Sequence, residues 1–176
     1  SSVESGLNVF ATNTFVIQKY PAISFGNERR KHRNRKNIDY SQYEKLKNRA
    51  QLPILVSVSE RSYVRDVKYK DRTVKNSVEL IGGDEGTVRC YNTYIADGRN
   101  FINEDIHHIR NVCILGMDVV DRLFPFEDPL GKRIHIEGLD YMVIGLTERQ
   151  GELFGESKDN FIAIPITTYL KRFSER

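Results

Sequence analysis

The sequence predicts an α+β fold whose strands pair mostly antiparallel. Two stretches, residues 63–81 and 133–146, each hold two strand-like runs joined by a short turn. A helix with a cap signal begins near Ser41, and a last strand-like run at residues 161–166 leads into a second helical pattern. With 176 residues, 39% of them hydrophobic and 29% charged, the chain is expected to form a single folded domain that buries its own core.

The first third of the chain predicts a strand, a loop, a helix and a second strand. Residues 13–20 are apolar enough for a strand, and the polar, basic stretch after them reads as a loop. Ser41 and Glu44 have the spacing of a capping box, so we expect a helix of about 10 residues that Pro53 ends. Residues 54–58 then read as a strand, which makes the order that of a βαβ-type unit.

The middle of the chain predicts a hairpin followed by a glycine-rich break. Residues 63–69 and 74–81 are strand-like and flank the polar turn at residues 70–73. We expect Gly82, Gly83 and Gly86 to end the second strand. The apolar run Val112–Leu115 predicts a buried strand.

The last third predicts a helix, a second hairpin, a strand and a final helix. Asp118 is placed to cap a helix, and Gly138-Leu139-Asp140 is expected to turn the chain between strands at residues 133–137 and 141–146. Residues 167–172 follow the strand at 161–166 and read as a helix. The spacing of the apolar residues predicts one shared core of Val112, Ile114, Leu123, Phe124, Ile134, Ile136, Val143 and Ile144.

Two short motifs partly match the signatures of nucleotide-binding proteins. Gly82-Gly83-Asp84-Glu85 matches four of the five letters of the diguanylate cyclase signature, but Gly86 stands where an aromatic residue is required. We interpret it as a glycine turn with solvent-exposed acids. Gly131-Lys132 has Phe126 where a phosphate-binding loop needs its first glycine, so we expect no ATP hydrolysis by this chain.

Metal and catalytic signatures are weak. His107 and His108 are adjacent and point to different sides of any regular element, so they chelate one ion poorly. Cys90 and Cys113 lack metal spacing, and a disulfide between them stays open from the sequence. No nucleophile elbow appears. We therefore expect neither an enzyme nor a cofactor or metal site in this chain.

One segment is strongly basic. It holds six cations without an acid, and removing them would turn the net charge of +3 into −3. Such a segment can contact phosphates of lipid headgroups or nucleic acid, or it can be a solvated loop. The six candidate residues for an anionic surface are Arg29, Arg30, Lys31, Arg33, Arg35 and Lys36.

A glycine-flanked loop is the second candidate contact. Leu153 and Phe154 lie between Gly151 and Gly155, after one strand and before another. Apolar residues on such a loop can contact a partner protein or substrate, or they can fold back on the core, and the sequence leaves both open.

An ordered set of short motifs resembles the extracytoplasmic, periplasmic core domain of MacB-like and FtsX-like ABC transporter permeases. The motifs, in chain order, are Asp97-Gly98-Arg99-x-Phe101, Val112-Cys113-Ile114-Leu115-Gly116, Leu123-Phe124, Asp128-Pro129-Leu130-Gly131-Lys132, Val143-Ile144-Gly145 and Asp159-Asn160-x-Ile162-Ala163-Ile164-Pro165. The resemblance implies a porter-like βαβ lobe and a second small α/β lobe called Sabre. We place the porter-like lobe at residues 1–82 with 147–176 and the Sabre-like lobe at 83–146.

The resemblance also implies a function and a set of partners. The domain would lie on the periplasmic side of the inner membrane, as part of a permease that works with a cytoplasmic ABC ATPase and faces a second permease subunit. A periplasmic adaptor protein is a further expected partner. The role would be export of a substrate, extraction of a lipoprotein, or control of cell-wall enzymes. The alternative is a module that binds nucleic acid or an anionic surface through the basic segment; since only Phe25 and Tyr40 flank that segment, it lacks a base-stacking platform and we expect no nucleic-acid partner.

Overall fold

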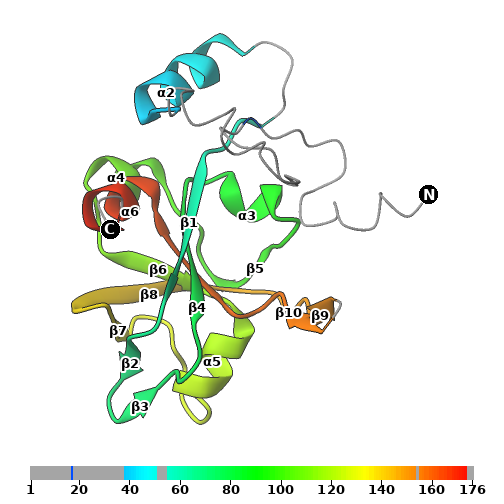
Figure 1. The fold of residues 1–176 in the computed structure, drawn as a ribbon, viewed down its shortest axis with the longest axis vertical. Coiled ribbons are helices and arrows are strands. Elements are labelled where there is room, and N and C mark those ends of the chain that lie inside the picture. The colour runs from blue at the N-terminus through cyan, green and yellow to red at the C-terminus, as the bar shows by residue number, and fades with distance from the viewer. Residues whose placement is uncertain (1–16, 18–37, 51–54, 154, 174–176) are drawn as a thin grey trace, which may run out of the picture.

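The computed structural model describes Ile17 and residues 38–50, 55–153 and 155–173. It has the α+β architecture that the sequence predicts, built on one large sheet with helices against it (Figure 1). None of the helices in the described ranges is both long and apolar enough to cross a membrane. The elements are α2 (Tyr40–Arg49), β1 (Ser59–Val64), β2 (Val67–Tyr69), β3 (Arg72–Thr73), β4 (Val78–Gly83), α3 (Thr87–Cys90), β5 (Ile95–Gly98), α4 (Asn103–His107), β6 (Val112–Leu115), α5 (Met117–Leu123), β7 (Arg133–Ile136), β8 (Leu139–Thr147), β9 (Glu152–Leu153), β10 (Glu156–Ser157), β11 (Phe161–Pro165) and α6 (Ile166–Phe173).

The large sheet has nine strands in the order β1-β4-β11-β6-β8-β7-β2-β3, with β5 paired to β8 beside this path. Two pairs are parallel, β4 with β11 and β6 with β8, and the other pairs of this sheet are antiparallel. The predicted preference for antiparallel pairing is therefore confirmed. The strand nearest the C-terminus, β11, lies between β4 and β6, in the interior of the sheet.

The core is divided between the two faces of the sheet, because successive residues of a strand point to opposite sides. On β6, Cys113 and Leu115 belong to one cluster, whereas Val112 and Ile114 belong to the other. Helix α5 packs in the first cluster, and α3 contributes Val88 to the second. The single shared core that the sequence predicted is thus wrong. Its members separate into Leu123, Phe124, Ile134, Ile136 and Val143 on one face and Val112, Ile114 and Ile144 on the other.

The N-terminal predictions are partly corrected. The expected helix is present as α2, but its cap is Asp39, whose carboxylate accepts from the Gln42 amide at 2.9 Å while the Gln42 side chain accepts from the Asp39 amide. Residues 55–58 are not in a strand, so the strand expected at 54–58 is wrong; β1 begins at Ser59. Except for Ile17, the predicted strand at residues 13–20 lies outside the described residues, and Ile17 itself is in no strand. The βαβ unit and the lobe boundaries stay predictions.

The first hairpin is split where the chain changes partners. The predicted turn at residues 70–73 is wrong, because it contains β3, which forms a tight hairpin with β2. The strands on either side change partners: β1 pairs with β4, whereas β2 also pairs with β7. At this switch the Glu137 carboxylate accepts hydrogen bonds from the amides of Arg65 and Asp66, at 3.0 and 3.3 Å. The strand ends at the predicted glycines, but two residues later than expected, because β4 includes Gly82 and has Gly83 as its last residue.

The later elements follow the sequence with small shifts. Helix α5 is capped by Gly116, and Asp118 lies in its first turn instead of at the cap. The turn between β7 and β8 is formed by Glu137 and Gly138, both at positive φ, one residue earlier than expected. This pair of left-handed residues is typical of a two-residue hairpin turn. β11 and α6 lie where the sequence placed them.

Candidate functional site

A small hairpin projects from one side of the large sheet and carries the predicted contact residue Leu153. Strands β9 and β10 pair only with each other in the described structure, and they lie away from the sheet (Figure 1). Gly151 and Gly155 both adopt φ +81°, a conformation that other residues rarely take, so the two glycines permit the turns of the hairpin. The sequence predicted a glycine-flanked loop at this position, and the structure shows that its residues form a hairpin.

The base of this hairpin is held by Asp159, a buried carboxylate. Asp159 accepts hydrogen bonds from the amide of Gln150 at 2.9 Å and from the amide of Gly151 at 2.8 Å. The Lys158 amide donates to the Gly151 carbonyl at 2.9 Å, which closes the base from the other side. Because charged acceptors make strong hydrogen bonds, the hairpin is presented on a fixed base.

Leu153 itself is half-buried, and Phe154 lies outside the described residues. Arg149, just before the hairpin, pairs with Asp121 of α5 at 2.8 Å and reaches Asp118 at 3.8 Å. The segment that leads into the hairpin is therefore tied to α5 as well as to Asp159, which lies two residues before β11. Its role as a contact for a partner or substrate stays a prediction.

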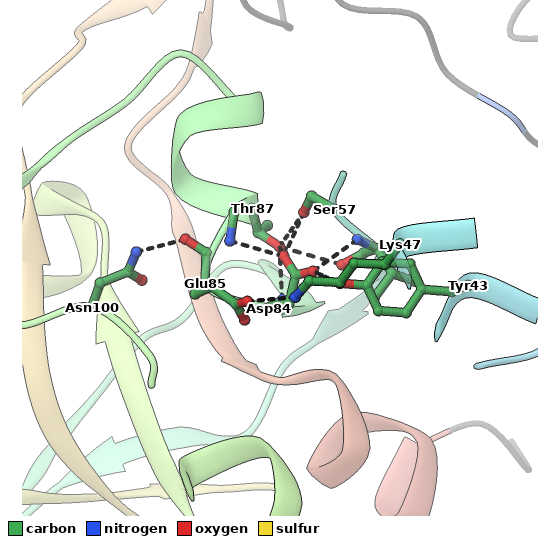
Figure 2. A network of polar contacts seen from close by, with 9 residues as sticks. Tyr43, Lys47, Ser57, Asp84, Glu85, Thr87 and Asn100 are labelled. Atoms are coloured by element: carbon green, nitrogen blue, oxygen red, sulfur yellow. Dashed lines mark hydrogen bonds and ion pairs between the residues drawn. The ribbon is translucent and has the colours of Figure 1, made fainter. Parts of the chain in front are cut away.

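A second candidate site surrounds Asp84, at the end of β4 (Figure 2). The Asp84 carboxylate is buried and accepts hydrogen bonds from the Tyr43 hydroxyl, the Ser57 hydroxyl at 2.5 Å and the Thr87 hydroxyl at 3.1 Å. Backbone amides of Val58 and Gly86 donate to it at 3.3 and 3.0 Å. The interpretation of Asp84 as a solvent-exposed acid is wrong: it joins α2, the segment before β1 and the turn before α3.

The neighbouring Glu85 is half-exposed and pairs with Lys47 of α2 at 2.5 Å. Burial alone would raise the pKa of Glu85, but the Lys47 ammonium outweighs it and the pKa lies below its ordinary value. For Tyr43, burial and the hydrogen bond to Asp84 raise the pKa of the phenol, so its hydroxyl stays protonated and donates. The Asn100 amide donates to the Glu85 carbonyl at 2.8 Å and fixes the turn (Figure 2).

A cleft of about 310 Å³ opens beside this corner, between α2 and α4. Its lining is mostly polar with two aromatic rings. The lining residues are Tyr40, Tyr43, Glu44, Lys47, Asn48, Asn103 and His107.

The other sequence candidates are dispersed or outside the described ranges. All six residues of the basic segment, Arg29 to Lys36, lie outside them. His107 lines the cleft and His108 is the C-cap of α4. No group of three or more potential metal ligands occurs among the described residues. Cys113 is buried and Cys90 is half-buried, and both are free thiols.

One charged group escaped the sequence analysis. Asp105 in α4 is fully buried and accepts hydrogen bonds from Arg99 at 2.6 Å, from the Ile102 amide at 3.1 Å and from Arg110 at 3.4 Å. Burial alone would raise the pKa of Asp105, but Arg99 and the Ile102 amide outweigh it and hold the pKa below its ordinary value. Asp105 lies in a polar stretch, where its sequence neighbours suggest solvent. The available signal was Arg99, part of a motif six residues earlier.

Comparison with known sequences finds similarity over the whole chain. A family described as the MacB-like periplasmic core domain matches residues 1–176. A macrolide export ATP-binding/permease protein MacB from Chlorobium phaeobacteroides is 30% identical over 106 residues, and one from Rhodopirellula baltica is 38% identical over 76 residues. These alignments cover 60% and 43% of this chain but only 16% and 11% of the relatives, so the chain spans a small part of their length.

Solved structures share the fold. The periplasmic region of MacB from Actinobacillus actinomycetemcomitans superposes with a TM-score of 0.65 at 20% identity, over 85% of this chain and 65% of that structure. The extracellular domain of the noncanonic ABC-type transporter YknZ from Gram-positive bacteria superposes with a TM-score of 0.55 at 19% identity, over 67% of this chain and 57% of that one. At these identities the likeness concerns the arrangement of helices and strands.

Proposed function

The chain belongs to the family of MacB-like periplasmic core domains, and from this premise we propose that it couples ATP hydrolysis to movement outside the cytoplasm. In this proposal the chain is the periplasmic domain of an ABC transporter permease in the inner membrane. A separate cytoplasmic ABC ATPase hydrolyses the ATP, and a second permease subunit faces the first. The movement exports a substrate or extracts it from the membrane. The family match over residues 1–176 is the observation that carries this proposal.

The projecting hairpin β9–β10 is the proposed contact for a periplasmic partner. Leu153 stands on a base fixed by Asp159, and a surface that is already ordered loses little conformational entropy on binding. The partner is an adaptor protein or the exported substrate. The basic segment from Arg29 to Lys36 is proposed to contact anionic lipid headgroups, which its charge supports.

The test is a distance measurement in the complete transporter. A spin label on the exposed Glu156, in both permease subunits, reports the separation of the two hairpins by pulsed electron paramagnetic resonance. We expect the distance distribution to change between the ATP-bound and ADP-bound states. An ATPase subunit that cannot hydrolyse ATP serves as the control and should hold the ATP-bound distribution. Distance distributions that are the same in the ATP-bound and ADP-bound states would contradict the coupling.

A further inference from the structure

Helix α2 is attached to the rest of the described structure by little apolar surface. Tyr43 is its buried residue, and Leu46, which helical spacing places on a neighbouring face, is 48% exposed. An isolated helix of this length is only marginally stable in water. Among the described residues, polar contacts are therefore the main attachment of α2.

Two polar contacts join α2 to the end of β4, and they form a clamp. The Tyr43 hydroxyl donates to the Asp84 carboxylate, and the Lys47 ammonium pairs with Glu85 at 2.5 Å. Tyr43 and Lys47 are four residues apart, so they lie on the same face of the helix and meet two consecutive acids (Figure 2). Tyr43, Lys47, Asp84 and Glu85 together form the clamp.

The Asp84 side of the clamp does not depend on α2. Without Tyr43, the Asp84 carboxylate would still accept hydrogen bonds from Ser57, Val58, Gly86 and Thr87. A buried carboxylate that loses its partners is strongly destabilising, but this one keeps four donors. Release of Tyr43 therefore leaves no unpaired buried charge, and the acceptor stays oriented for the helix to return.

The other half of the clamp is also easily released. Both side chains of the Lys47–Glu85 pair are about two-fifths exposed, at 42% and 41%. Exposed pairs contribute little net stability because water and salt screen them. The Lys47–Glu85 ion pair thus attracts α2 toward Asp84 but adds little to the stability of the attached state.

The position of α2 sets the width of the cleft. Tyr40 and Asn48 of α2 line one wall of the cleft, and Asn103 and His107 of α4 line the other. Helix α4 is fixed to the body, because the Thr167 hydroxyl of α6 donates to the Ile106 carbonyl at 2.6 Å and Asp105 is held by Arg99. Any change in the width of the cleft must then come from α2.

We propose that α2 is a detachable lid: the clamp holds it beside α4 as one wall of the cleft, and release of Tyr43 from Asp84 widens the cleft while the large sheet stays folded. Opening exposes the tyrosine face of α2 and the polar wall of α4 together. This device is independent of the ATP coupling proposed above and is a property of the chain alone.

Hydrogen exchange of the 176-residue chain tests the lid. In Tyr43→Phe, the amides of α2 should exchange at least about tenfold faster than in the wild type, since a hydrogen bond to a charged acceptor is lost. Amides of β4 and β11 should stay within about twofold of the wild-type rate, because only local opening is affected. The matched control is Tyr40→Phe, a tyrosine one turn earlier on the same helix, which should leave α2 protection unchanged.

A cross-link gives the reverse test. In a Cys90→Ser background, the pair Lys47→Cys and Glu85→Cys can be joined by a reducible bifunctional thiol reagent. The amides of α2 should exchange more slowly in the cross-linked chain than in the same variant before cross-linking, and reduction should restore the earlier rate. Unchanged α2 protection in Tyr43→Phe, equal losses in Tyr40→Phe, or a loss spread over β4 and β11 would each overturn the lid.

Discussion

Gly82 and Tyr169 lie so close together that a β-carbon on residue 82 would overlap the β-carbon and ring of Tyr169. The next residue repeats the arrangement on the other face, where a β-carbon on Gly83 would overlap the side chain of Thr87. The two glycines therefore let α6 and the first residue of α3 pack directly on β4 from opposite sides. This packing explains the glycine pair of the cyclase-like motif without any nucleotide.

Gly82→Ala should consequently destabilise the protein. Overpacking of this kind costs about 1–3 kcal/mol, and here the obstacle includes the Tyr169 β-carbon, which cannot swing away without moving α6. Chemical denaturation monitored by circular dichroism measures the loss. A variant as stable as the wild type, within about 0.5 kcal/mol, would show that α6 lies further from β4.

Because the core lies on both faces of the sheet, substitutions on opposite faces should have additive effects on stability. Ile114 and Phe124 are buried in different clusters, on opposite faces of the sheet. Ile114→Ala and Phe124→Ala should each lower the free energy of unfolding by about 2–5 kcal/mol. Because the two sites share no cluster, their effects should add within about 0.5 kcal/mol in the double variant. Met142→Ala, at a half-exposed position on β8, is the control and should cost less than about 1 kcal/mol.

Most elements of the fold could be predicted from local patterns in the sequence. The predictions failed where an element depends on how distant strands pair in the sheet. Alternation and turn residues located β6, β7, β8 and β11 within a residue or two. They could not show that the strand at 63–69 leaves β4 for β7, because the switch depends on Glu137, about 70 residues away. Likewise, glycines normally interrupt strands, but at 82 and 83 the close packing of α6 and Thr87 selects them.

Low pH should lower the free energy of unfolding because it protonates Asp105. The pKa of Asp105 in the folded protein lies below the value near 3.9 of the unfolded chain. Its contribution to the free energy of unfolding is therefore full above that pH and is lost as the pH falls through the folded-state pKa. Asp105→Asn should cost about 1.5–3 kcal/mol at neutral pH and should flatten the fall in stability below about pH 4. Asp140→Asn, which changes an exposed acid, should leave both properties nearly unchanged. Equal acid sensitivity in the wild type and Asp105→Asn would remove Asp105 as the cause.

The two thiols should differ in reactivity. Burial raises the pKa of both Cys90 and Cys113, but Cys113 is fully buried in the first core cluster whereas Cys90 is half-buried. Since the thiolate is the reactive form, iodoacetamide should label Cys90 slowly and leave Cys113 unlabelled until the protein unfolds. Mass spectrometry of the native protein checks this order. Labelling of Cys113 first would mean that the sheet opens at β6.

The basic segment should bind anionic membranes. Each cation near such a surface contributes about 1 kcal/mol, and salt screens the attraction. The chain should therefore co-sediment with vesicles rich in anionic phospholipid at low salt and be released at high salt. The variant with all six cations from Arg29 to Lys36 changed to Gln should stay in solution. Equal behaviour of the two proteins would contradict the role of this segment.

The candidate sites were only partly accessible to sequence reasoning. Glycines located the segment that carries Leu153, because they act locally, but the pairing of its two short strands was not predicted. The burial of Asp84 depends on Tyr43 and Ser57, which are 41 and 27 residues away in the chain, and no local pattern encodes that meeting. Its sequence neighbours are glycines and another acid, which suggest solvent. The clamp became visible only with the tertiary contacts.

The central place of β11 has a mechanical consequence. β11 is hydrogen-bonded to β4 on one side and to β6 on the other, and α6 follows it directly after Pro165. A force applied through α6 along β11 would act in shear on the ladders of both sides at once, because ladder hydrogen bonds run across the strands. Strands that are loaded at a sheet edge can be peeled off one bond at a time, whereas this one cannot. A pulling force on α6 is thus transmitted to the middle of the sheet, where the strands on both sides of β11 share it.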